Sequence, residues 1–362
     1  MICSTSSSTR AACALLAVLL GGCARAQKPP SRQVRIAVFP PVNLGSGAAP
    51  MKELRGAIEA ALRAQRFELV EPAALEAFLA RHRVRYSGGL DRETAIAASA
   101  ELGVEGVVIT AVESFQATPP RLSVTQRLVS AGDAPAILWI DGVSRSGDES
   151  PGFFDLGIIS DGGELAAKMF GDLASSMAAF RDNRGPRAPP CAAARRFRPR
   201  NSFRSPLLEP GTSRRVAVLP FLNETQRRGA GEAMALEFAR QFEAAGNFRV
   251  VEPGLVRDEL LRYRIVMEDG VSLDTARVVS ELLGSDLVLA GYVRDYDDGS
   301  VPKVDFTVLL LDKANSEVLW QSTSYNRGND GVFVFDAGAL GTAAALACRM
   351  AREVVDGMNR ER

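Results

Sequence analysis

The run Ile36-Ala37-Val38-Phe39-Pro40 decides the fold, because the chain repeats it as Val216-Ala217-Val218-Leu219-Pro220. A second run, FELVEP at residues 67–72, returns as FRVVEP at residues 248–253. Self-similarity at a nearly fixed offset indicates one structural unit that is present twice. A residue that occurs in only one copy is therefore not demanded by the shared fold.

The first half of each copy predicts strands and helices in the same order. A short apolar strand is followed by a helix whose apolar side chains recur every four residues. A second strand ends at a proline, and two helices follow, the second of them between capping residues. The predicted strands are 34–40, 68–70, 215–220 and 249–251, and the predicted helices lie around 54–62, 75–83, 91–103, 234–242, 255–264 and 272–284.

The second half of each copy predicts three strands and a closing helix. Residues 304–310 alternate apolar and polar side chains, which is the period of a half-buried strand. Turn residues 312–316 then lead to Trp320, which indicates a hairpin, and Trp139 stands at the matching place in the first copy. This shared position favours a structural role for the tryptophans over a role as interface anchors. Each unit is thus βαβααβββα, an α/β sandwich with a mixed sheet.

We therefore expect two tandem domains, at residues 33–180 and 214–362. The segment between them, 181–213, is rich in Pro and Arg, and we expect it to lack regular structure. The chain is 46% apolar and 24% charged, as soluble globular proteins are. Its 43 basic and 43 acidic residues balance, so no overall field attracts nucleic acid.

The first 32 residues predict an export signal and a tether. The apolar stretch 11–20 is shorter than the roughly 20 residues of a membrane-spanning helix. It ends in Leu20-Gly21-Gly22-Cys23, which resembles the bacterial lipobox. We expect cleavage after Gly22, lipidation of Cys23, and a tether over 23–32. The alternative is an ordinary signal peptide with an incidental cysteine. Ala24 after the cysteine suggests the periplasmic face of the outer membrane, by analogy with lipoprotein sorting.

Four stretches of the second copy carry a family resemblance. They are VAVLPFLNET (216–225), FRVVEP (248–253), LLGSDLVLAGYV (282–293) and LLLDKANSEVLW (309–320). They resemble the N-terminal domain of TolB and the related domains of the curli-secretion lipoprotein CsgG and the penicillin-binding-protein activator LpoB. The resemblance covers most of the second copy and, more loosely, the first. It implies a non-catalytic envelope domain that binds other proteins, and it brings no catalytic residues.

Catalytic and cofactor motifs are incomplete. His82 is the only histidine and lies between Arg81 and Arg83, which favours a solvated helix end over a catalytic base. The pairs Gly45-Ser46-Gly47 and Gly229-Ala230-Gly231 suggest a dinucleotide loop, but both lack the third glycine. No cluster of Cys and His has the spacing of a zinc site. We therefore expect no enzyme activity and no cofactor.

Three further features occur in one copy or in the linker. Asp295, Asp297 and Asp298 form a weak candidate for a divalent-cation site, with a polar turn as the alternative. A basic stretch of the linker suggests contact with an anionic partner, with a solvated linker as the alternative. It contains Arg195, Arg196, Arg198 and Arg200, then Arg204, with Phe197 and Phe203 among them. Outside the signal and Cys23 the cysteines are Cys191 and Cys348, for which a disulfide and free thiols both remain open.

The expected function is that of an outer-membrane lipoprotein acting in protein–protein interaction or envelope assembly. Its partners would be envelope proteins, with the membrane contacted through the lipid. The alternative is a CsgG-like homo-oligomer in a secretion assembly, but the sequence lacks the amphipathic hairpins that a membrane pore requires. An envelope enzyme is the third and least favoured hypothesis.

Overall fold

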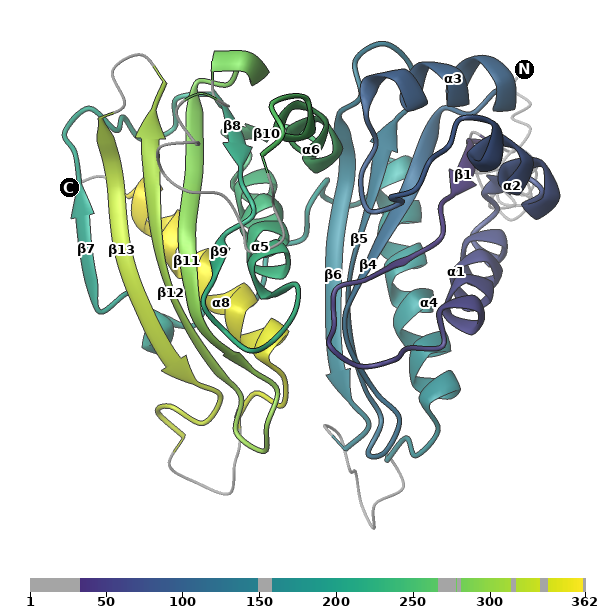
Figure 1. Cartoon of the computed structure of the whole chain (residues 1–362). Helices are drawn as coiled ribbons and strands as arrows, with labels where there is room; N and C mark the ends of the chain where they lie inside the picture. The colour runs from purple at the N-terminus through teal and green to yellow at the C-terminus, as the bar shows by residue number, and fades with distance from the viewer. Residues whose placement is uncertain are drawn as a thin grey trace, which may run out of the picture. The chain divides into compact units, whose positions relative to one another are not determined.

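The computed structural model describes residues 33–148, 158–265, 278, 281–313, 317–332 and 338–360. Its first sheet, sheet A, has the strand order β3-β1-β4-β5-β6, with β2 beside β4 (Figure 1). β1 is parallel to β3 and β4, whereas β5 is antiparallel to both of its neighbours, β4 and β6. The strands are β1 (Arg35–Val38), β2 (Val42–Asn43), β3 (Glu68–Leu69), β4 (Gly106–Gln116), β5 (Arg121–Ser130) and β6 (Ile137–Ser146).

The second sheet, sheet B, repeats this order as β10-β8-β11-β12-β13, with β9 beside β11, and then adds β7 at the edge. Both sheets carry a bulge at the same two places, in β4 and β11 and beside Trp139 and Trp320. The fold class is confirmed: two α/β sandwich units, each with a mixed sheet. The strands are β7 (Asn201–Arg204), β8 (Arg214–Val218), β9 (Leu222–Asn223), β10 (Phe248–Val250), β11 (Leu287–Asp297), β12 (Lys303–Asp312) and β13 (Val318–Arg327).

Each sheet has two long helices packed on one face. α1 (Met51–Ala64) and α4 (Gly162–Arg181) cover sheet A, and α5 (Ala230–Ala245) and α8 (Ala343–Asn359) cover sheet B. Shorter helices cover part of the opposite faces: α2 (Pro72–Arg81) and α3 (Arg92–Leu102) in the first copy, and α6 (Pro253–Arg262) in the second. Of the counterpart of α3 predicted at 272–284, the structure describes residue 278 and residues 281–284. The predicted signal and tether lie outside the described residues.

Helix α5 differs from its counterpart α1 in how much of its surface is buried. α1 buries Leu54, Ile58 and Leu62 on one face, as its four-residue spacing predicts. α5 buries nearly every side chain from Ala230 to Glu243. The reason is that α5 and α8 pack on sheet B and also contact β6 of sheet A, where Ile137 and Ile140 join their core. The second copy therefore fills the face of sheet A that α1 and α4 leave free.

The segment 181–213 is more ordered than its composition predicts. Residues Arg195–Phe197 form a 3-10 helix, η2, and Asn201–Arg204 pair with β13 as strand β7. The prediction of no regular structure is wrong there, because Phe197 is fully buried in the core of sheet B and α8. Pro199 and Pro206 flank β7 and so leave its ladder intact. None of the helices in the described parts of the chain is long and apolar enough to cross a membrane.

Candidate functional site

A buried ion pair joins the two copies. Arg127 on β5 and Glu252 at the start of α6 are both inaccessible to solvent, with Arg127 Nη2 lying 3.0 Å from Glu252 Oε1. Arg127 Nη2 also donates to the carbonyl of Gly88 at 2.6 Å. The amides of Leu90 and Gly254 donate to Glu252 Oε1, each at 3.3 Å. Glu252 is thus held from both copies, and its position depends on the way they meet.

The repeated VEP motif does not by itself indicate that Glu252 forms a buried ion pair, because the same motif occurs in both copies. Glu71 and Glu252 both precede a proline that begins a helix, α2 or α6. Glu71 is exposed to solvent, whereas Glu252 is fully buried. Identical local sequence therefore places one carboxylate in water and the other against an arginine of the neighbouring unit.

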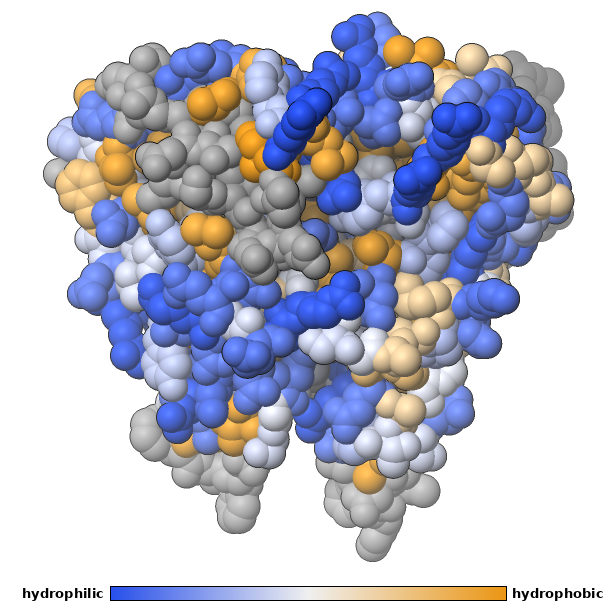
Figure 2. Space-filling view, viewed as in Figure 1, coloured by the Kyte–Doolittle hydropathy of each residue, from blue (hydrophilic) through white to orange (hydrophobic). Residues whose placement is uncertain are grey.

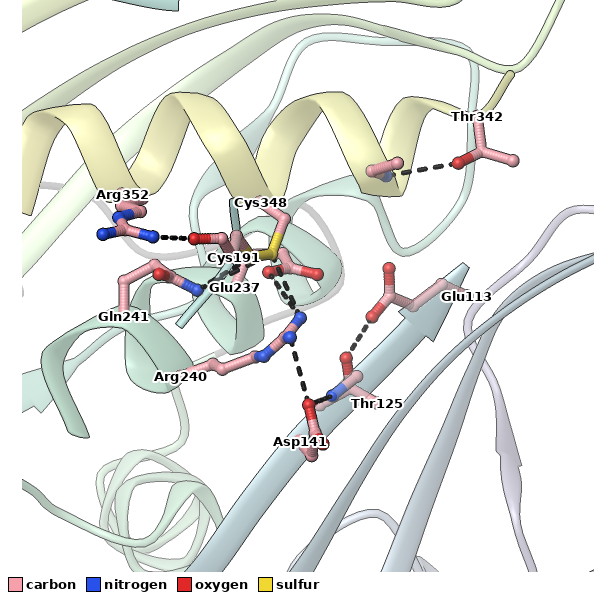
Figure 3. Close-up of a disulfide and its surroundings, with 12 residues drawn as sticks. Glu113, Thr125, Asp141, Cys191, Glu237, Arg240, Gln241, Thr342, Cys348 and Arg352 are labelled. Atoms are coloured by element: carbon pink, nitrogen blue, oxygen red, sulfur yellow. Dashed lines mark hydrogen bonds and ion pairs between the residues drawn. A yellow bond between two sulfur atoms is a disulfide. The ribbon is translucent and has the colours of Figure 1, made fainter. Parts of the chain in front are cut away.

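A second group of charges lies where α5 meets sheet A (Figure 3). Arg240 on α5 contacts Asp141 on β6 at 3.0 Å and Glu237 at 3.8 Å. Glu113 on β4 accepts a hydrogen bond from Thr125 Oγ1 at 2.5 Å. Burial raises the pKa of Glu113 and of Asp141, and burial raises the pKa of Glu237 to about 8. These three carboxyls and one guanidinium form a buried cluster between the copies, and Glu113, Glu237 and Arg240 also line a cavity of about 220 Å³ there.

A disulfide borders this cluster. Cys191, in the segment before β7, is bonded to Cys348 on α8, with their Cα atoms 6.0 Å apart. Of the two alternatives that the sequence left open, the structure has the disulfide, and a Cα separation of this size is typical of one. Figure 3 shows Arg240 beside it, with Nη1 3.0 Å from Cys348 Sγ. The bond ties the connecting segment to the helix layer between the sheets.

The raised pKa of Glu237 predicts a pH dependence of stability. Its folded-state value, about 8, lies above the ordinary 4.5, so the folded protein holds this proton more tightly than the unfolded chain. The resulting stabilisation is complete below about pH 4.5 and is lost as the pH rises through about 8. We expect Glu237→Gln to gain stability relative to the wild type over this range, by up to about 1.4 kcal/mol per pH unit.

Urea unfolding between pH 5 and pH 8 measures this difference. Glu53→Gln, at an exposed position of α1, is the matched control and should give a curve parallel to that of the wild type. Parallel curves for Glu237→Gln and the wild type would contradict the prediction.

The two glycine pairs do not occupy equivalent positions in the two copies. Asn43 closes the first loop, because its Nδ2 donates to the carbonyl of Gly47 and its Oδ1 accepts from the amide of Gly45. Asn223 closes the matching loop of the second copy by donating to the carbonyl of Arg227. Gly231 instead lies within α5, where a Cβ would come 2.0 Å from the carbonyl oxygen of Phe221. Close backbone packing explains this glycine without a phosphate.

His82 and the aspartates also have local roles. His82 follows α2, and its Nε2 lies 2.7 Å from Glu101 Oε1, so it is partly buried rather than fully solvated. Asp298 accepts from the amide of Ala343 at 2.7 Å, and Asp297 from that of Gly299 at 3.1 Å. Within the described ranges, one group of three His, Cys, Asp or Glu side chains has its ligand atoms within 4.8 Å of one another, and it consists of Cys191, Glu237 and Cys348. Asp295, Asp297 and Asp298 do not converge in this way.

The predicted arginine contacts are partly used inside the molecule. Arg198 pairs with Glu353 at 3.5 Å, and Arg196 donates to the carbonyl of Gly338. Arg200 lies over the ring of Tyr325, 4.5 Å from its centroid, while Arg195 is exposed. Three of these four side chains thus help to hold the segment against the second copy. Cys23 and Gly22 lie outside the described residues.

In the part of the chain that the structure describes, one face of sheet B is less covered than the matching face of sheet A. On β5 the side chains of Ser123, Thr125 and Arg127 face the second copy and are fully buried. Their counterparts on β12, placed by the pairing of Leu128 with Trp139 and of Leu310 with Trp320, are all partly exposed. Figure 1 views this face with α8 behind it, and Figure 2 shows mainly hydrophilic residues over its lower half. We call it the open face; it comprises Tyr292, Arg294, Asp305, Thr307, Leu309, Gln321, Thr323 and Tyr325.

Comparisons with known proteins give structural likenesses only. No protein-family model and no curated protein matches the chain. The PelC dodecamer from Paraburkholderia phytofirmans is 16% identical, with 45% of this chain and 97% of that chain covered and a TM-score of 0.31. Lipoprotein GNA1162 from Neisseria meningitidis is 16% identical, with 40% of this chain and 99% of that chain covered and a TM-score of 0.29. The C-terminal domain of LpoB from Escherichia coli is 17% identical, with 37% of this chain and 93% of that chain covered and a TM-score of 0.27. Each of these likenesses covers less than half of this chain.

Proposed function

We propose that this chain is a lipid-anchored protein of the cell envelope that binds another protein through the open face of sheet B and catalyses no reaction. One observation carries the proposal. The first copy already uses the corresponding face of sheet A to hold α5 and α8 of the second copy. The second copy presents the same face without a covering helix pair in the described part of the chain.

The open face has side chains suited to a protein partner. Arg294 is exposed and donates to Asp305 Oδ1 and Thr307 Oγ1, both at 2.9 Å. Tyr292 lies on the same strand, β11, and Tyr325 on β13, and both are partly exposed. Tyrosine and arginine are the residue types enriched at the energetic centres of protein interfaces. A partner would displace water from this polar surface and pair with groups that the fold already holds in place.

The buried charges support binding over catalysis. Glu113, Asp141 and Glu237 have raised pKa values, which often mark active sites. They lie between the copies, where Glu113 and Glu237 line a cavity of about 220 Å³, and they pair with Arg240 or with Thr125. These side chains hold the two units together, a structural role that equally explains their pKa shifts.

Changes on the open face should abolish partner capture. We expect Arg294→Glu combined with Tyr325→Ala to lower the amount of crosslinked partner recovered from envelope extracts about tenfold or more. Arg92→Glu on α3, an exposed arginine away from this face, is the matched control. Mass spectrometry of material crosslinked to the affinity-tagged full-length chain measures the recovery. If the double variant and the wild type recover the same proteins in equal amounts, the open face is not the docking surface.

The anchor has its own test. We expect Cys23→Ser to move the protein from the membrane fraction to the soluble fraction, because a thioether-linked lipid requires the cysteine thiol. Fractionation of cells that express each form, followed by metabolic labelling with a fatty acid, measures both location and lipid. Cys191→Ser is the matched cysteine control and should keep label and location. Retention of Cys23→Ser in the membrane fraction would overturn the anchor.

A further inference from the structure

A groove lies between the two copies beside the start of α5. It has a volume of about 930 Å³, with Val42, Leu44 and Tyr86 on the side of the first copy and Pro220, Arg228 and Arg257 among the residues on the side of the second. Adjoining it is a mainly apolar pocket of about 50 Å³, which Val42, Leu44, Ala111, Val218 and Leu236 help to line. Neither copy could form this site alone, since its walls come from both.

The groove is basic. Four arginines line it, Arg227, Arg228, Arg257 and Arg264, against the single carboxylate of Glu232. Arg227 is used by the fold, because it donates to the carbonyl of Glu113 and lies over the ring of Tyr296. Within the described ranges the guanidinium groups of Arg228, Arg257 and Arg264 have no carboxylate partner, although Arg257 stacks on Tyr86 at 4.0 Å. Three guanidinium groups are therefore available to an anion.

The repeat shows that the fold does not require this charge. At the positions that match Arg227, Arg228 and Arg257, the first copy has Gly47, Ala48 and Glu76. A structural role shared by the two sandwich units cannot explain arginines that occur in one unit only. Arg228 and Arg257 are specific to the second copy, whereas Arg264 has a counterpart in Arg83 of the first. The two specific arginines lie beside an apolar pocket, an arrangement common to binding sites.

We propose that this groove binds an acidic peptide segment of a partner protein, with one short aliphatic side chain in the apolar pocket and carboxylates paired with Arg228, Arg257 and Arg264. The pocket size selects a peptide. A water-sized probe needs about 10–15 Å³, so about 50 Å³ accommodates a group of roughly four such spheres. A space of this size suits one short aliphatic side chain of a peptide, with the arginines of the adjoining groove placed to pair with its carboxylates. The site is separate from the open face of sheet B, and neither proposal depends on the other.

A peptide array tests the proposal on the detergent-solubilised full-length chain. The probes are pentapeptides with Asp or Glu around a central Leu, Val, Ile or Met, and fluorescence anisotropy measures their affinity. We expect a subset to bind, and Arg228→Gln with Arg257→Gln to weaken that binding about tenfold or more. Replacing the central residue by Ser should weaken it by a similar factor. Arg92→Gln is the matched control, and an unchanged thermal unfolding midpoint shows that the groove variant is folded.

Three results would overturn the proposal. One is the absence of binding by every acidic peptide on the array. Another is equal binding of the corresponding Asn and Gln peptides, which would remove the role of charge. The third is binding of phosphatidylglycerol vesicles that depends on the same two arginines while the peptides show none, which would assign the groove to a membrane surface. The Arg294→Glu and Tyr325→Ala changes on the open face should leave peptide affinity unchanged, so the two proposals fail separately.

Discussion

Replacing Glu252 by Ala should lower the free energy of unfolding by about 3–5 kcal/mol, because it leaves Arg127 buried without its counter-charge. Both side chains are fully buried, so water cannot take the place of the lost carboxylate. The amides of Leu90 and Gly254 lose an acceptor as well. Because these groups come from both copies, the change should weaken the contact between the copies as well as the second unit itself.

The repeat supplies the control for this experiment. Glu71 occupies the same place in the first VEP motif but is exposed, so Glu71→Ala should change stability by about 0.5 kcal/mol or less. The double change Arg127→Met with Glu252→Leu removes both charges and should recover much of the loss. Denaturant unfolding followed by tryptophan fluorescence measures all three. Equal effects of Glu71→Ala and Glu252→Ala would show that the ion pair does not hold the copies together.

Replacing both Cys191 and Cys348 by Ala should lower the free energy of unfolding by about 2–5 kcal/mol. The bond links residues 157 positions apart, so it restricts the unfolded chain over most of the second copy. In an oxidising envelope compartment the bond would persist. The effect should be seen without any change in the folded structure, since small apolar side chains are tolerated where Cys191 and Cys348 are buried.

A reductant distinguishes the bond from the side chains. Dithiothreitol should lower the urea midpoint of the wild type toward that of the double variant and leave the double variant unaffected. The single change Cys348→Ala should behave like the double variant, because either change removes the bond. A wild-type midpoint that does not respond to reductant under denaturing conditions would contradict the prediction.

Most of the fold could be predicted from local sequence. The apolar runs, the four-residue spacing in α1 and α5, and the alternation in β12 are periodic signals that depend only on near neighbours. The repeat strengthened each of them by supplying a second example. Strand β7 was missed because four polar and aromatic residues form a strand there only by pairing with the edge of β13. The sequence signal for order in the connecting segment was Phe197 of η2, an aromatic residue within a basic stretch that packs into the core.

The candidate site could be predicted much less well. The helix that the repeat aligned with α1 carries Glu237, Arg240 and Gln241 where α1 has Ala57, Ala60 and Ala61. Polar residues on one more face of the second helix were a signal that this face meets another charged surface. Asp141, which pairs with Arg240, and the neighbouring Glu113 and Thr125 lie on three separate strands of the first copy. No spacing along the chain relates these residues to α5.

The sequence by itself determined the repeated unit and the order of its strands and helices along the chain, because those properties follow from periodicity and residue type. Only the tertiary structure decided how the copies meet: that α5 and α8 lie against sheet A, that Glu252 is buried while Glu71 is not, and that Cys191 reaches Cys348. The physical reason is that the burial of a side chain depends on which surfaces pack against each other, and local sequence does not decide this. Two copies with nearly the same local sequence present the same face, and the packing of one on the other buries that face in the first copy and leaves it exposed in the second.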